Sequence, residues 1–109
     1  MIKMIQMCLQ LHGHEVLSAN NGQEALDIAA TQAPDLVLMD VMMPQMDGLD
    51  ALKRLKDDRA TTHLPVIMLT AKGEAEDIVR SLQAGADLHL AKPFSCEELI
   101  TIIKRMYDT

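Results

Sequence analysis

Hydrophobic residues recur at intervals of three and four positions in five stretches of the chain, the spacing of one buried helix face. Most of these stretches have a residue that typically begins or ends a helix. The pattern predicts five helices: one from residue 1 to Gly13, one from the Asn21 cap to Pro34, one opening at Asp47, one that Gly85 closes, and one capped by Ser95.

Short apolar runs between these helices predict four strands. The runs Asp35–Asp40 and Pro65–Thr70 hold consecutive apolar residues, which is typical of strands buried on both faces of a parallel sheet. His14–Ala19 and Leu88–Ala91 are shorter candidates. Because helices and strands alternate along the chain, the sequence predicts an α/β fold with a doubly wound parallel sheet.

Polar residues end three of the apolar runs. They are Asp40, Thr70 and Lys92, and the carboxyl ends of parallel strands meet at one edge of the sheet. Each residue alone also has an ordinary structural interpretation: Asp40 as a turn former, Thr70 as a strand residue and Lys92 as a solvated cation. Together they offer a carboxylate nucleophile, a hydroxyl donor and a positive charge, a combination that suits phosphoryl chemistry.

Composition narrows the class of protein. The chain has 109 residues, of which 49% are hydrophobic, so we expect one soluble domain over residues 1–109. A net charge of −6 without a cluster of Lys and Arg argues against nucleic-acid binding. No stretch of the sequence resembles a membrane span or a leader peptide.

Cysteine and histidine usage predicts neither a disulfide nor a metal site. Cys8 and Cys96 are far apart and form no CxxC pair, which favours a reducing compartment such as the cytoplasm. His12 and His14 flank a turn glycine, and His63 falls in a predicted loop, so we do not expect them to be ligands.

The chain resembles the receiver domain of bacterial two-component response regulators along its whole length. The resemblance is carried by the Asp35–Asp40 strand with the Met42-Met43-Pro44 and Met46-Asp47-Gly48 segments after it, by Pro65–Ala71, and by Ala84–Asp87 through Lys92-Pro93-Phe94. It implies a flavodoxin-like receiver fold. It also implies a signalling domain that assists its own phosphorylation and dephosphorylation and is not a turnover enzyme.

The resemblance also implies residue roles. Asp40 would accept a phosphoryl group from a histidine kinase or phosphotransfer protein, Thr70 would bond a phosphoryl oxygen, and Lys92 would pair with its charge. The Lys92-Pro93 bond would be cis. Thr70 and His89 would form the switch that changes a protein-binding surface, for a downstream effector protein or an output domain of a parent chain. The alternative for His89 is a partly exposed polar substitute that alters partner specificity.

In the family, a magnesium ion is held by the acceptor aspartate, by a backbone carbonyl two residues later, here that of Met42, and by an acidic pair that ends the first strand. No Asp or Glu precedes Glu15, so Asp40 and Met42 form an incomplete site and weak Mg²⁺ binding is expected. The sequence thus resembles an N-terminally truncated receiver of four strands and five helices, whose exposed strand edges offer a route to self-association.

Two alternatives to a phosphorylated switch stay open. One is a pseudo-receiver, a protein-interaction module that works without phosphorylation. The other is a small hydrolase of the haloacid-dehalogenase type with Asp40 as nucleophile, which is disfavoured because Met42 stands where that class carries a second aspartate.

Overall fold

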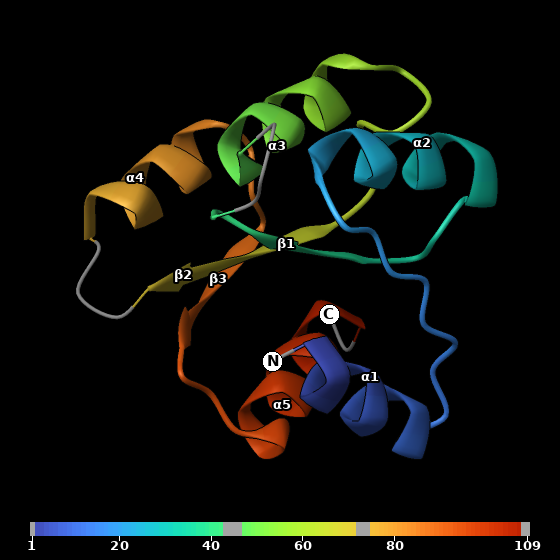
Figure 1. Cartoon of the computed structure of the whole chain (residues 1–109). Coiled ribbons are helices and arrows are strands. Elements are labelled where there is room, and N and C mark those ends of the chain that lie inside the picture. Colours follow the sequence, from blue (N-terminus) through green and yellow to red (C-terminus); the bar gives the residue numbers. More distant parts are fainter. Residues whose placement is uncertain (1, 43–46, 72–74, 108–109) are drawn as a thin grey trace. The chain divides into compact units, whose positions relative to one another are not determined.

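The computed structural model describes residues 2–42, 47–71 and 75–107. Five helices and three strands form in these residues (Figure 1). In chain order they are α1 (Ile2–Leu11), α2 (Gly22–Gln32), β1 (Val37–Asp40), α3 (Gly48–Asp57), β2 (Val66–Ala71), α4 (Ala75–Gln83), β3 (Leu88–Lys92) and α5 (Cys96–Tyr107). None of the helices in the described residues has the length and apolar content needed to cross a membrane.

The chain divides into two compact units. The first combines its two ends, Met1–Ser18 and Phe94–Thr109, and therefore contains α1 and α5. The second is the continuous segment Ala19–Pro93, which contains the sheet and the other three helices. The expectation of a single domain over the whole chain stays a prediction.

Side-chain caps begin three of the helices, as the sequence predicts. Each cap oxygen accepts a hydrogen bond from the backbone N–H three residues later, which satisfies a donor that the helix itself leaves free. The pairs are Asn21 with Glu24 at 2.9 Å, Asp47 with Asp50 at 2.9 Å, and Ser95 with Glu98 at 3.1 Å.

The sheet is parallel and has the order β1-β2-β3. β2 lies in the middle, and its residues from Val66 to Thr70 are all buried, which confirms the predicted burial on both faces. The same prediction is wrong for β1, where Met39 alone is buried. The physical reason is its place in the sheet, since in the described residues β1 pairs only with β2.

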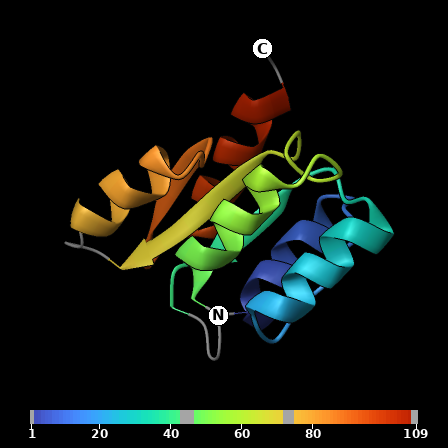
Figure 2. The same cartoon turned by 90° about the horizontal axis from the view of Figure 1, so that it is seen from above.

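Helices α2, α3 and α4 lie on one side of this sheet (Figures 1 and 2). The apolar face of α3, which carries Leu49, Leu52 and Leu55, packs with Met39 and Met68 from the strands into one buried cluster. This core fixes the sheet and α3 relative to each other, and the loop between β1 and α3 leaves from the carboxyl end of β1.

The predicted strand at residues 14–19 does not form. A strand needs a neighbour to receive its backbone hydrogen bonds, and no strand in the described part of the chain pairs with this segment. In the described residues the sheet therefore has three strands rather than four, while the α/β class, the parallel arrangement and the five helices are confirmed. Truncation of the N-terminus and self-association through strand edges stay predictions.

The expectation of no disulfide is wrong. Cys8 on α1 and Cys96 at the start of α5 are bonded, with their Cα atoms 5.8 Å apart. Spacing along the chain could not indicate this pair because the two residues are separated by 88 positions and meet only when α1 packs against α5.

Candidate functional site

Asp40 and Lys92 lie at the carboxyl ends of β1 and β3, on either side of the central strand β2. The Lys92 ammonium donates to both carboxylate oxygens of Asp40, at 3.0 Å to Oδ1 and 2.9 Å to Oδ2. Both side chains are 24% exposed, so the pair is shielded from water yet reachable from it. The long lysine side chain thus joins two strands that are not neighbours.

The Asp40 carboxylate has a further hydrogen-bond donor two residues later in the chain. The backbone N–H of Met42 donates to Asp40 Oδ1 at 2.9 Å. The N–H of Gly48, the first residue of α3, donates to the carbonyl of Val41 at 2.9 Å. A Cβ atom at position 48 would collide with the Asp40 carbonyl, so only glycine allows α3 to start this close to the strand end.

Thr70 brings a buried hydroxyl to the same edge of the sheet. β1 and β2 pair Asp40 with Leu69, so Thr70 lies one residue beyond the partner of Asp40. Its side chain has no exposed surface, and its Oγ1 atom has no hydrogen-bond partner among the described residues. A buried hydroxyl without a partner costs free energy, which a ligand oxygen at this position would recover.

His89 lies on the neighbouring strand. β2 and β3 pair Met68 with His89 and Thr70 with Ala91, so the two-residue repeat of a strand puts His89 and Thr70 on the same sheet face. The Nδ1 atom of His89 is buried and, within the described residues, has no partner either. The switch role of this pair stays a prediction.

The residues present do not form a complete magnesium site. In the described parts of the chain, no group of three His, Cys, Asp or Glu ligands includes Asp40. Asp40 is also bonded through both oxygens to a lysine, whose positive charge opposes a divalent cation. One carboxylate and the Met42 carbonyl are few ligands for an ion that requires six oxygens.

The sequence also predicted a cis peptide bond and a motif after Asp40 at this site. The Lys92-Pro93 peptide bond is cis. Met43, Pro44 and Met46, which belong to the motif after Asp40, lie outside the described residues. Asp40, Lys92 and Thr70 lie at one edge of the sheet. The sequence did not predict the grouping of Cys8 and Cys96 with His12, whose ligand atoms all lie within 4.8 Å of one another.

The fold and this edge define an α/β protein with a carboxylate–lysine centre at the carboxyl ends of a parallel sheet. The chain belongs to the response regulator receiver domain family, whose model matches residues 1–104. Receiver domains are signalling domains rather than turnover enzymes, so the hydrolase alternative falls away.

Known relatives agree with this assignment. The phosphate regulon transcriptional regulatory protein PhoB of Pseudomonas aeruginosa is 42% identical over 94% of this chain, which spans 44% of PhoB. The polar-differentiation response regulator DivK of Brucella anthropi is 39% identical over 94% of this chain and 84% of its own length. The chain thus spans less than half of PhoB and most of DivK.

Solved structures show the same fold. The receiver domain of NtrX from Brucella abortus has a TM-score of 0.90 at 30% identity, covering 98% of this chain and 89% of its own. The receiver domain of the sensor histidine kinase PA1611 from Pseudomonas aeruginosa has a TM-score of 0.90 at 32% identity, covering 99% and 88%. The latter structure has a magnesium ion coordinated in its active site cleft.

Proposed function

We propose that this receiver domain accepts a phosphoryl group on Asp40 and thereby switches a protein-interaction surface. The observation that carries the proposal is a pair of hydrogen bonds at the carboxyl edge of the sheet, which Lys92 donates to both carboxylate oxygens of Asp40. The donor would be a histidine kinase or a phosphotransfer protein in the cytoplasm. The response would pass to an effector protein or to an output domain of a parent chain.

The proposed step is a displacement at phosphorus. One carboxylate oxygen of Asp40 forms a bond to the phosphorus atom, the bond from phosphorus to the donor group breaks, and that group leaves with the bonding electrons. Lys92, already held at this carboxylate, neutralises charge on the phosphoryl oxygens. Thr70 donates its unused hydroxyl to one of those oxygens, and the altered position of Thr70 is passed to His89.

Incubation with a small-molecule phosphodonor such as acetyl phosphate, with magnesium in the buffer, tests this function. The expected product carries one phosphoryl group, measured as a mass increase of the intact protein, and the linkage is stable in acid and labile in base. Unchanged mass after prolonged incubation would favour the second candidate function.

The second candidate is a pseudo-receiver that binds partners without phosphorylation. The small number of metal ligands favours it, since within the described residues no further carboxylate joins Asp40 in a three-ligand group. A partner would then bind equally well to the wild-type protein and to Asp40→Asn.

Replacing Lys92 by Ala should slow phosphoryl transfer to Asp40 by about 100-fold, because loss of one fixed charge or donor near the reacting group typically has that effect. The measurement is the initial rate of mass gain with acetyl phosphate. Lys53→Ala, which removes an exposed lysine from α3, is the matched control and should leave the rate unchanged. Equal rates in the wild-type and Lys92→Ala proteins would remove Lys92 from the mechanism.

Magnesium should bind weakly. Cation affinity rises with the number of charged ligands, and Asp40 is the one carboxylate that the described site offers, so we expect a dissociation constant of about 1 mM or higher. A magnesium titration followed by NMR shifts of the Asp40 and Met42 amides measures it. Saturation well below that concentration would mean that further carboxylates complete the site.

A further inference from the structure

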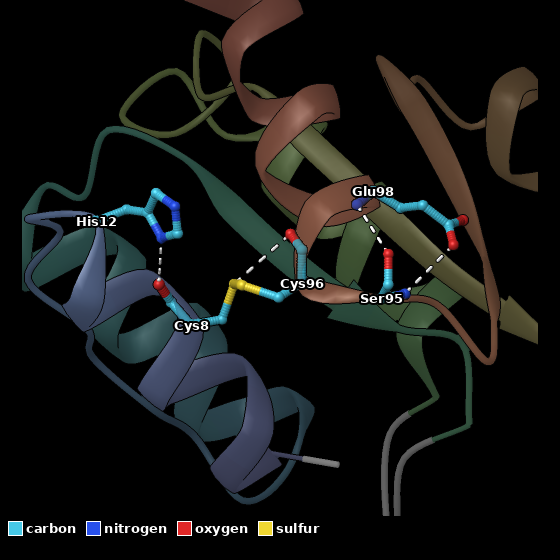
Figure 3. Close-up of a disulfide and its surroundings, with 5 residues drawn as sticks. All are labelled: Cys8, His12, Ser95, Cys96 and Glu98. Carbon is cyan, nitrogen blue, oxygen red and sulfur yellow. Dashed lines mark hydrogen bonds between the residues drawn. A yellow bond between two sulfur atoms is a disulfide. The ribbon is translucent and has the colours of Figure 1, made fainter.

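Cys8, Cys96 and His12 form a second chemical site, in the compact unit that contains α1 and α5 (Figure 3). The disulfide joins the two ends of the chain across 88 positions. Its Cα separation of 5.8 Å lies in the usual range for a disulfide, so the packing of α1 against α5 brings the two cysteines to bonding distance. Asp40, Thr70 and Lys92 belong to the other unit, so the two sites share no residue.

The two sulfurs differ in access. The Cys8 side chain is buried, at 3% exposure, whereas Cys96 is half-buried. Cys96 is also the first residue of α5, where free backbone N–H groups and the helix dipole favour a negatively charged sulfur, although Glu97 and Glu98 in the same turn oppose this. A reagent from solution therefore reaches Cys96 before Cys8.

His12 places an imidazole ring beside the sulfurs. Its Nδ1 atom lies 2.9 Å from the carbonyl oxygen of Cys8. A carbonyl can only accept, so Nδ1 carries the proton, and in the neutral ring Nε2 keeps a free lone pair. His12 is exposed, and a ring nitrogen and both sulfurs lie within 4.8 Å of one another.

The surroundings also suit the reduced state. Cys8 Sγ lies 3.6 Å from the carbonyl oxygen of Cys96. In the disulfide this sulfur has no proton to share, but in the free thiol the S–H can donate to that oxygen.

We propose that Cys8 and Cys96 form a reversible redox site that exchanges with low-molecular-weight thiols and disulfides, with Cys96 as the sulfur that reacts first.

In oxidation, the Cys96 thiolate attacks a small disulfide and releases one thiolate. Cys8 then attacks the mixed disulfide at Cys96 and releases the second. Two protein thiols lose two electrons and two protons, and the small disulfide gains both and becomes two small thiols. His12 takes up one thiol proton and returns it to a released thiolate, and the second proton reaches the other thiolate through water. Reduction by a small thiol reverses both steps.

The reversibility of this site rests on the cytoplasmic location that the proposed function includes. Disulfides of proteins in a reducing compartment are usually transient and redox-sensing rather than permanent. The bond would fix the N-terminal helix to α5 when the surroundings become oxidising and release it when they become reducing. A different occupant of the same three residues is a zinc ion, since two thiolates and an imidazole are zinc ligands.

The test uses the full chain in buffers with varied ratios of reduced to oxidised glutathione, with thiols counted by alkylation and mass spectrometry. The wild-type protein should pass reversibly from two free thiols to one internal disulfide. Cys8→Ser should trap a glutathione adduct on Cys96, and this adduct should form at least about ten times faster than the adduct on Cys8 in Cys96→Ser, because thiol reactivity depends on access. His12→Gln should slow exchange but leave the midpoint ratio unchanged.

Three outcomes would overturn the proposal. One is the absence of an internal disulfide in excess oxidised glutathione. Another is equal adduct rates in the two single-cysteine variants. The third is stoichiometric zinc binding by the reduced protein that protects both thiols from oxidised glutathione, which would identify a metal site instead.

Discussion

Replacement of Asp40 by Asn should reduce phosphoryl acceptance by at least about 100-fold, because removal of a nucleophile leaves only binding and charge stabilisation. The amide has nearly the shape of the carboxylate and keeps one oxygen that can accept from Lys92, so the fold should persist. The rate of acyl phosphate formation with acetyl phosphate measures the effect, and a thermal melt checks the fold.

Asp57→Asn is the matched control for this variant. Asp57 is an exposed carboxylate at the end of α3, so the same chemical change there should leave phosphorylation at the wild-type level. An Asp40→Asn protein that is folded and still labelled at the wild-type rate would show that another residue is the acceptor.

Reduction of the Cys8–Cys96 disulfide should lower the free energy of unfolding by about 4.6 kcal/mol. The bond closes a loop of 88 positions, and the chain-entropy account gives a stabilisation of that size for loops of this length. Urea unfolding of the oxidised protein and of the protein kept reduced measures the difference.

The double variant Cys8→Ser/Cys96→Ser provides the control. It should unfold at the same urea concentration with and without reductant, and close to the reduced wild-type protein. A difference below about 1 kcal/mol between oxidised and reduced wild-type protein would mean that the bond does not constrain the unfolded chain as its loop length requires.

The sequence predicted helices better than strands because helix signals are local. Asn21, Asp47 and Ser95 bond to N–H groups three residues away, so the information that begins each helix lies within one turn. A strand depends on a neighbour that is distant in sequence. The His14–Ala19 segment has the composition of a strand but, in the described residues, no partner for its backbone, and it stays irregular.

The candidate site was predictable for a related reason. Asp40, Thr70 and Lys92 each end an apolar run, and parallel strands bring such ends together whatever the separation along the chain. The direct bond between Asp40 and Lys92 was not predictable in detail, since it depends on the reach of one lysine across the end of β2. Cys8 and Cys96 do not end an apolar run in this way, and only the packing of α1 on α5 brings them together.

The most direct test of the phosphoryl-acceptor proposal is to locate the modified residue. The protein is incubated with acetyl phosphate, the acyl phosphate is reduced with borohydride to the corresponding alcohol, and peptides are sequenced by mass spectrometry. The account predicts that aspartate is converted to homoserine at position 40 and at no other position. Conversion at a different carboxylate, with residue 40 recovered as unmodified aspartate, would contradict it.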